Sequence, residues 1–201
     1  MIFETHAHYD DKMFDEDRES LLESMQEAGI GRIVNIGADL VSTASSIALA
    51  EKYPFIYAAA GVHPSDAAQL NEHTFQWLSE QTAHEKVVAV GEIGLDYYWE
   101  KDPEVRANQR YWFRRQLNLA REKALPVSIH SRDAAKDTLD IAKEERLAEI
   151  GGVVHCFSYT VEMAREYLNM GMYLGIGGVL TYKNARVLKE VVDYAPMDRI
   201  V

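Results

Sequence analysis

Two histidines near the start of the chain, His6 and His8, are separated by one residue and follow a short apolar segment. On a β-strand, residues i and i+2 point to the same face, so both imidazole rings can reach one ion. Neutral imidazole is a strong ligand for divalent transition metals, and burying two unpartnered histidines is costly. The pair therefore predicts a metal site, with an exposed or hydrogen-bonded pair as the alternative.

One glutamate, Glu92, directly follows another apolar segment. A carboxylate at this position is unfavourable in a core but suits an oxygen ligand that bridges two cations. Taken alone, such a residue is more often a helix cap or part of a salt bridge in a loop than a metal ligand. Asp96, four residues later, is interpreted as a residue that orders the loop, and Gly91 and Gly94 fit a close approach of two backbones.

Two further histidines, His130 and His155, each close an apolar segment. A single histidine after an apolar strand is more often structural than a ligand. Their occurrence together with the first pair and the glutamate, all at strand ends, favours a shared metal site. His63 and Arg132 are expected on the same face, where Arg132 offers a rigid fork of donors for a phosphate or carboxylate.

The segments that position these residues alternate between two patterns. Runs rich in β-branched residues start about 20 to 40 residues apart, the spacing of βα units rather than of hairpins. Apolar residues at three- and four-residue spacing lie between them at 21–28, 112–120 and 164–170, and Gly29 and Gly171 are expected to end two of these helices. The expected strands are 1–3, 32–36, 56–62, 87–93, 126–130, 152–156 and 173–176, and 199–201 opens an eighth.

Repeated βα units form either a doubly wound open sheet or a closed barrel. A doubly wound sheet concentrates functional residues at one switch point, whereas a barrel carries them at strand ends all the way round. Here His or Glu follows several of the expected strands, which favours the barrel. We expect an α/β fold of the (β/α)8, TIM-barrel-like kind, forming a single domain over residues 1–201.

Composition limits the possible functions. The chain has 21 basic and 32 acidic residues, and its net charge of -11 argues against a broad basic face for nucleic acid. One segment, 101–123, is basic; it is interpreted as a solvated helix face, with contact to a polyanion as the alternative.

Other features of the sequence concern the protein's environment. No stretch approaches the roughly 20 apolar residues of a membrane helix, so no membrane partner is expected. The one cysteine, Cys156, cannot form an internal disulfide, which favours a reducing compartment, and we expect a cytoplasmic protein. As the neighbour of His155 on a strand, Cys156 is expected to point the opposite way, into packing.

Five blocks of this sequence, in order, resemble the signature blocks of the TatD family of metal-dependent deoxyribonucleases. They are FETHAH at 3–8, GVHP at 61–64, GEIGLDY at 91–97, PVSIHSR at 126–132 and VHCFS at 154–158. The resemblance extends over essentially the whole chain. It implies a TIM-barrel-like fold and a two-metal hydrolysis of phosphodiester bonds in DNA, acting from the 3′ end on a single-stranded end.

The resemblance also implies a role for each matched residue. His6, His8 and Glu92 would hold one divalent ion, and Glu92 would bridge to a second ion held by His130 and His155. The catalytic group would comprise Glu92 together with His63 and Arg132, which would hold the scissile phosphate. Imidazole ligands favour Zn²⁺, whereas phosphoryl chemistry often uses Mg²⁺ or Mn²⁺. No obligate protein partner is expected, and we expect a monomer.

The sequence departs from the family pattern in two places. Glu4 replaces the usual Asp before the His-x-His pair, which bears on the metal geometry. Family members also continue past the position of Val201 into a strand whose Asp ligates the first metal, so the eighth strand and last helix are expected to be missing from this chain. Two alternatives remain: an amidohydrolase-type metal-dependent hydrolase of a small ester or amide, and a non-catalytic barrel that only binds.

Overall fold

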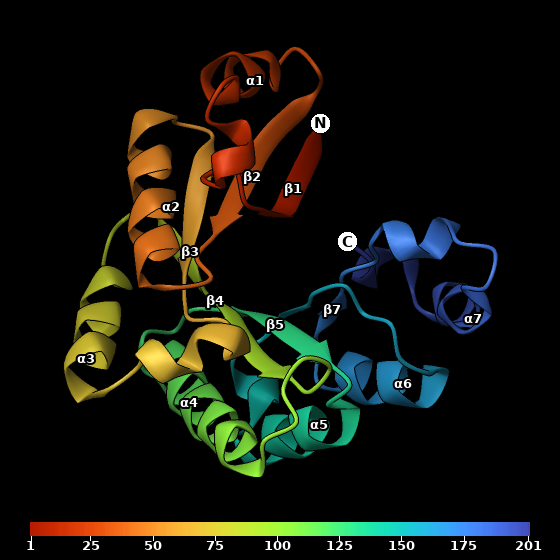
Figure 1. The fold of residues 1–201 in the computed structure, drawn as a ribbon. Helices are drawn as coiled ribbons and strands as arrows, with labels where there is room; N and C mark the ends of the chain where they lie inside the picture. Colours follow the sequence, from red (N-terminus) through yellow and green to blue (C-terminus); the bar gives the residue numbers. More distant parts are fainter.

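Seven parallel strands follow one another around a single curled sheet in the computed structural model, which describes residues 1–201 (Figure 1). Each strand pairs with its neighbours in the sequence, in the order β1 to β7 without reversal. This order is that of a barrel and not of a doubly wound sheet. The expected TIM-barrel-like fold is thus confirmed, as a curled half-barrel. The strands are β1 (Ile2–Ala7), β2 (Ile30–Ile36), β3 (Ile56–Ala60), β4 (Val87–Asp96), β5 (Val127–Arg132), β6 (Gly152–Val154) and β7 (Tyr173–Leu174).

Helices connect the strands and cover the outer face of the sheet (Figure 1). The pattern at 112–120 lies inside one long helix, and Gly171, at φ of +79°, directly follows the C-cap of another helix as expected. The helix expected at 21–28 ends early, at Ser24, and Gly29, at φ of +87°, follows a run of turns. None of the helices is long and apolar enough to cross a lipid bilayer. The helices are α1 (Arg18–Ser24), α2 (Leu40–Lys52), α3 (Glu72–Gln81), α4 (Pro103–Glu122), α5 (Ala135–Glu144), α6 (Val161–Asn169) and α7 (Arg186–Tyr194).

The strand ends differ from expectation where they carry polar residues. β4 continues three residues beyond the expected end because its register with β5 holds as far as Asp96, which pairs with Arg132. β6 ends two residues early, at Val154, because the chain turns there and Cys156 adopts a φ of +44°. The segment expected to open an eighth strand does lie beside β7: Ile200 pairs with Leu174 in parallel.

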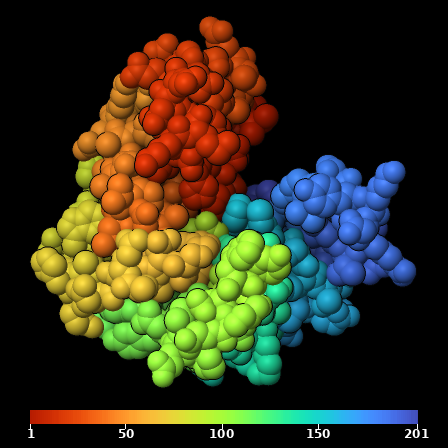
Figure 2. All heavy atoms as spheres, viewed as in Figure 1, coloured from red at the N-terminus to blue at the C-terminus, as the bar shows by residue number.

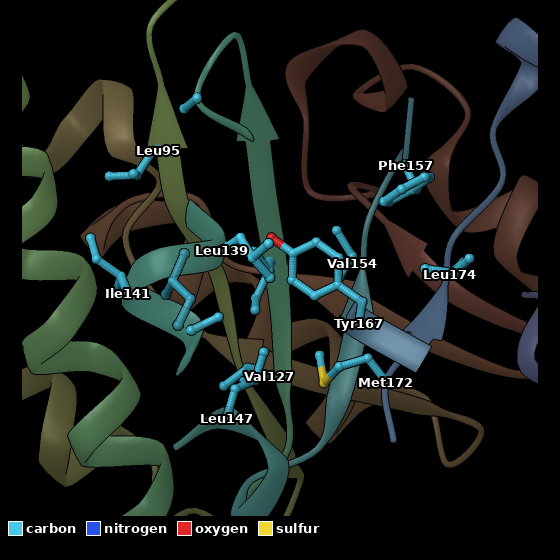
Figure 3. Close-up of a cluster of buried hydrophobic side chains, with 14 of the residues drawn as sticks. Leu95, Val127, Leu139, Ile141, Leu147, Val154, Phe157, Tyr167, Met172 and Leu174 are labelled. Atoms are coloured by element: carbon cyan, nitrogen blue, oxygen red, sulfur yellow. The ribbon is translucent and has the colours of Figure 1, made fainter. Parts of the chain in front are cut away.

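Two clusters of buried side chains fix the helices to the sheet. The larger cluster has 23 buried residues from β4 to β7 and from helices α4 to α7. In Figure 3, Val154 from β6 lies beside Tyr167 from α6, and Leu95, Val127 and Leu174 from the neighbouring strands belong to the same cluster. The smaller cluster has 16 buried residues and packs α1 to α3 against β2 and β3. The polar residues at the ends of β4, β5 and β6 are therefore carried by strands that belong to the larger cluster.

The basic segment at 101–123 is committed to internal contacts. Arg114 pairs with Glu144 and Glu145, and Arg115 pairs with Glu72. Lys101, Arg106 and Arg121 donate hydrogen bonds to backbone carbonyl oxygens. Arg110 donates to the phenol oxygen of Tyr97 and pairs with Asp137. This favours the solvated structural helix over a contact for a polyanion.

Gly94 allows β4 and β5 to approach closely beside the polar strand ends. Its φ is +147°, and a Cβ added there would lie 1.9 Å from the carbonyl oxygen of His130. A Cβ at Gly91 would lie 2.8 Å from Ser128 Cβ, so both glycines fit the close approach that the sequence suggested.

We expect Gly94→Ala to lower the free energy of unfolding by about 3 kcal/mol or more, because backbone strain and a backbone clash act together. Gly171→Ala is the matched control, since its φ is +79° but nothing lies within 4 Å of an added Cβ. That control should lose only about 1 kcal/mol. Urea denaturation of both variants measures the difference, and equal losses would show that the close approach is unimportant.

Candidate metal centre

Polar side chains from five strand ends meet at the carboxyl edge of the sheet. Parallel strands end on the same side, so side chains far apart in the sequence are brought together there. The central residue is Glu92 on β4, which is 5% exposed. Around it lie His6 and His8 from the end of β1, His63 after β3, His130 on β5 and His155 after β6.

The two oxygens of Glu92 face different histidines. Oε2 lies 3.4 Å from Nε2 of His6 and 3.9 Å from Nε2 of His8. Oε1 lies 2.9 Å from Nδ1 of His130. One carboxylate therefore stands between two sets of imidazoles, as a bridging ligand would.

The hydrogen bonds of His8 show which of its nitrogens is free. Nδ1 lies 3.0 Å from the carbonyl oxygen of Ile36, which can only accept, so Nδ1 carries the proton. Nε2 then presents a lone pair, and it lies 3.1 Å from Nε2 of His6. Electron-rich atoms gathered around Glu92 Oε2 repel one another unless a cation or proton lies between them. This donor set fits a divalent metal ion.

The ligand atoms fall into two groups that share Glu92. In each group they lie within 4.8 Å of one another: His6, Glu92 and His155 form one group, and His63, Glu92 and His130 form the other. The rings of His6 and His155 are stacked at 3.4 Å, and those of His63 and His130 are 4.2 Å apart. This grouping differs from the expected division, since His155 lies with His6 and His63 joins the second group. The distribution of ligands between two ions stays a prediction.

The protonation states of His155, His63 and Glu92 suit metal binding. Burial lowers the pKa of His155 to about 4, aided by the nearby His6, and lowers that of His63 to about 4, aided by His130. Both rings are therefore neutral at pH 7, the form that binds metals. Burial alone would raise the pKa of Glu92, but hydrogen bonds with His130 and His6 hold it well below its usual value. The carboxylate is ionised.

Asp96 has a role that the sequence did not reveal. The carboxylate is buried, and its Oδ2 lies 3.0 Å from Nε2 of His130. Carboxylates commonly orient a metal-binding histidine in this way. Its Oδ1 accepts hydrogen bonds from the backbone N–H groups of Tyr98 and Trp99, as expected of a loop-ordering residue. Only the second role could be inferred from its position after a strand.

A cavity of about 430 Å³ opens beside the ligand groups. Arg132 is exposed and lines it together with His63 and His130. Cys156 also lines it and is exposed, so the expectation that it packs into the core is wrong. Because β6 ends at Val154, the alternation of faces on a strand does not extend to Cys156.

A curled parallel sheet with such a donor set at its carboxyl edge is typical of the metal-dependent hydrolases built on barrels. The TatD related DNase family model matches residues 3–201. The chain belongs to this family of metal-dependent hydrolases.

Several relatives are similar over the whole chain. An uncharacterized metal-dependent hydrolase of Bacillus subtilis, YabD, is 45% identical over 201 residues, which are 78% of its own length. The 3'-5' ssDNA/RNA exonuclease TatD of Cronobacter sakazakii is 33% identical over 201 residues, or 76% of its length. The crystal structure of YjjV, a TatD homologue from Escherichia coli, superposes with a TM-score of 0.91 at 33% identity, covering 100% of this chain and 77% of that one.

Glu92→Gln keeps the size of the side chain but removes the charge that offsets bound cations. We expect the affinity for Mn²⁺ or Zn²⁺, measured by isothermal titration calorimetry, to fall by more than about 100-fold. Glu149→Gln, which changes a surface carboxylate that pairs with Arg146, is the matched control and should bind as the unaltered chain does. Equal binding by both variants would place the metal ions away from Glu92.

Proposed function

We propose that this chain hydrolyses phosphodiester bonds of DNA from the 3′ end of a single strand, using two divalent ions. The observation that carries the proposal is the shared carboxylate: Glu92 belongs to two groups of ligand atoms at once. The exonuclease relative from Cronobacter sakazakii supports the substrate class. The ions would be Mg²⁺, Mn²⁺ or Zn²⁺, held by His6, His8, Glu92, His130 and His155.

Some of the protein's side chains would position the substrate and the metal ligands, and others would compensate the charge of the ions. Two ions bound together supply activation of a water molecule and stabilisation of the leaving oxygen. Glu92 would help to hold both ions and would offset their charge. Arg132 and His63, which both line the cavity, hold and orient the scissile phosphate. Asp96 fixes the ring of His130 through Nε2.

The amidohydrolase alternative is less well supported by the same cavity. Enzymes of that type commonly bridge their metals with a modified lysine on the fourth strand. Here the fourth strand supplies Glu92, and no lysine lines the cavity. A barrel that only binds has little support, because the five expected ligands are all present around one centre.

The expected activity is removal of nucleotides from the labelled 3′ end of a single-stranded oligodeoxynucleotide. It should appear with one or more of Mg²⁺, Mn²⁺ and Zn²⁺ and disappear with EDTA. We expect a 5′ label to be retained on progressively shorter products. Products resolved on a denaturing gel, across the metal series, give the polarity directly.

His155→Asn separates this activity from a contaminating nuclease. The variant removes a ring nitrogen from the first ligand group and should lose at least about 100-fold in kcat/KM. His73→Asn is the matched control, because His73 is exposed on α3. Equal activity in both variants, or no hydrolysis by the unaltered chain with any metal, would contradict the proposed function.

A further inference from the structure

Two aromatic side chains in the loop between β4 and α4 are exposed beside the metal centre. Tyr98 is 43% exposed and Trp99 is 71% exposed. Their rings meet edge to face, with centroids 4.6 Å apart. Exposed aromatic rings of this size cost free energy in water, so adjacent ones point to a binding surface. In Figure 2, the lime-green part of the chain that contains this loop projects from the face shown.

Arg132 completes this surface and connects it to the cavity. Its guanidinium carbon lies 3.9 Å from the ring centroid of Tyr98 and 5.6 Å from that of Trp99. The same side chain lines the metal cavity. It forms no ion pair, unlike Arg110, Arg114 and Arg115 on α4. Its N–H groups are therefore available to an anion while its planar face stacks on tyrosine.

The loop is held in place by the metal centre itself. Asp96 Oδ1 accepts from the backbone N–H of Tyr98 at 3.0 Å and of Trp99 at 3.4 Å. Its other oxygen contacts His130. Lys101 donates to the carbonyl oxygen of Tyr97 at 2.7 Å, which closes the loop from its far side. The aromatic rings thus have a fixed position relative to a candidate ligand of the metal ions.

We propose that Tyr98, Trp99 and Arg132 form a stacking platform for an unpaired nucleobase of the substrate strand. The proposal rests on the proposed function, because the phosphate next to this base would lie in the cavity that Arg132 lines. Every base has a π-face, so stacking tolerates any sequence, and an Arg plane adds a cation–π contribution. A base inside a duplex already stacks on its neighbours. The platform therefore selects strands whose terminal bases are unpaired. It contacts the face of the base, whatever its identity, and does not contact the sugar.

The test compares substrates with and without bases. One single-stranded oligodeoxynucleotide carries ordinary nucleotides at its 3′ end, and the other carries abasic tetrahydrofuran residues at its last two positions. With the unaltered chain, we expect the abasic strand to have a KM about tenfold higher, the order expected for one stacked base. In Trp99→Ala this ratio should fall close to one, and in Trp99→Phe most of it should remain. Replacing Trp99 leaves the core intact, because its side chain is exposed.

A second aromatic–arginine pair supplies the matched control. Tyr194 is also 43% exposed, and Arg165 lies 5.5 Å from its ring centroid, on helices away from the metal cavity. Tyr98→Ala should reduce the ratio of KM values, and Tyr194→Ala should leave it unchanged. A ratio near one in the unaltered chain, or an unchanged ratio in Trp99→Ala, would overturn the platform.

Binding without turnover separates this proposal from the proposed function. The probe is an oligothymidylate with phosphorothioate linkages, titrated against the metal-loaded chain while tryptophan fluorescence is recorded. We expect quenching that Trp99→Phe abolishes and that an abasic strand of equal charge does not produce. Quenching without hydrolysis of ordinary DNA would retain the platform and reject the nuclease. Hydrolysis without quenching would reject the platform alone.

Discussion

The arrangement of this site depends on one buried carboxylate. An isolated ionised carboxylate in a protein interior is strongly unfavourable, and it persists only where positive charge or several donors face it. Glu92 is 5% exposed, and imidazoles face both of its oxygens. The histidines hold the pKa of Glu92 low, and Glu92 holds the pKa of His130 above its usual value. Cations placed between these groups would satisfy the same electrostatic requirement more completely, which is why the donor set and its buried position belong together.

The backbone around Glu92 is shaped to bring those groups within reach. The register of β4 and β5 places Gly94 opposite His130, and the absence of a side chain at Gly94 lets the two strands approach. Asp96, at the end of the same strand, then reaches the far nitrogen of His130. Strand β4 thus supplies three things: the shared carboxylate of Glu92, the space at Gly94 that lets β5 approach, and Asp96, which orients His130. The two clusters of buried side chains behind the sheet keep this strand in place.

Much of this could be predicted from the sequence because it follows from strand periodicity. The spacing of His6 and His8 requires only that the segment be a strand, and their common face then follows. The barrel order followed from polar residues at many strand ends. Cys156 could not be placed correctly, because its direction depends on where β6 ends, and that is set by a turn with positive φ. The contacts of His63 and Asp96 could not be predicted from the sequence either, because each is made between strands and depends on their register.

The charge distribution explains why substrate recognition has to be local. A net charge of -11 repels a polyanion at long range, and the arginines of α4 that could oppose this repulsion are paired with carboxylates of the same chain. Attraction for the phosphodiester of the proposed substrate would then come from charges inside the cavity. Bound divalent ions are the strongest of these, and Arg132 is the cavity cation without an ion pair. Neither the divalent ions nor Arg132 can distinguish a nucleic acid from another phosphate ester. For the proposed nucleic acid substrate, contacts to the bases would supply that discrimination, and the exposed rings of Tyr98 and Trp99 are the groups next to Arg132 that can make them.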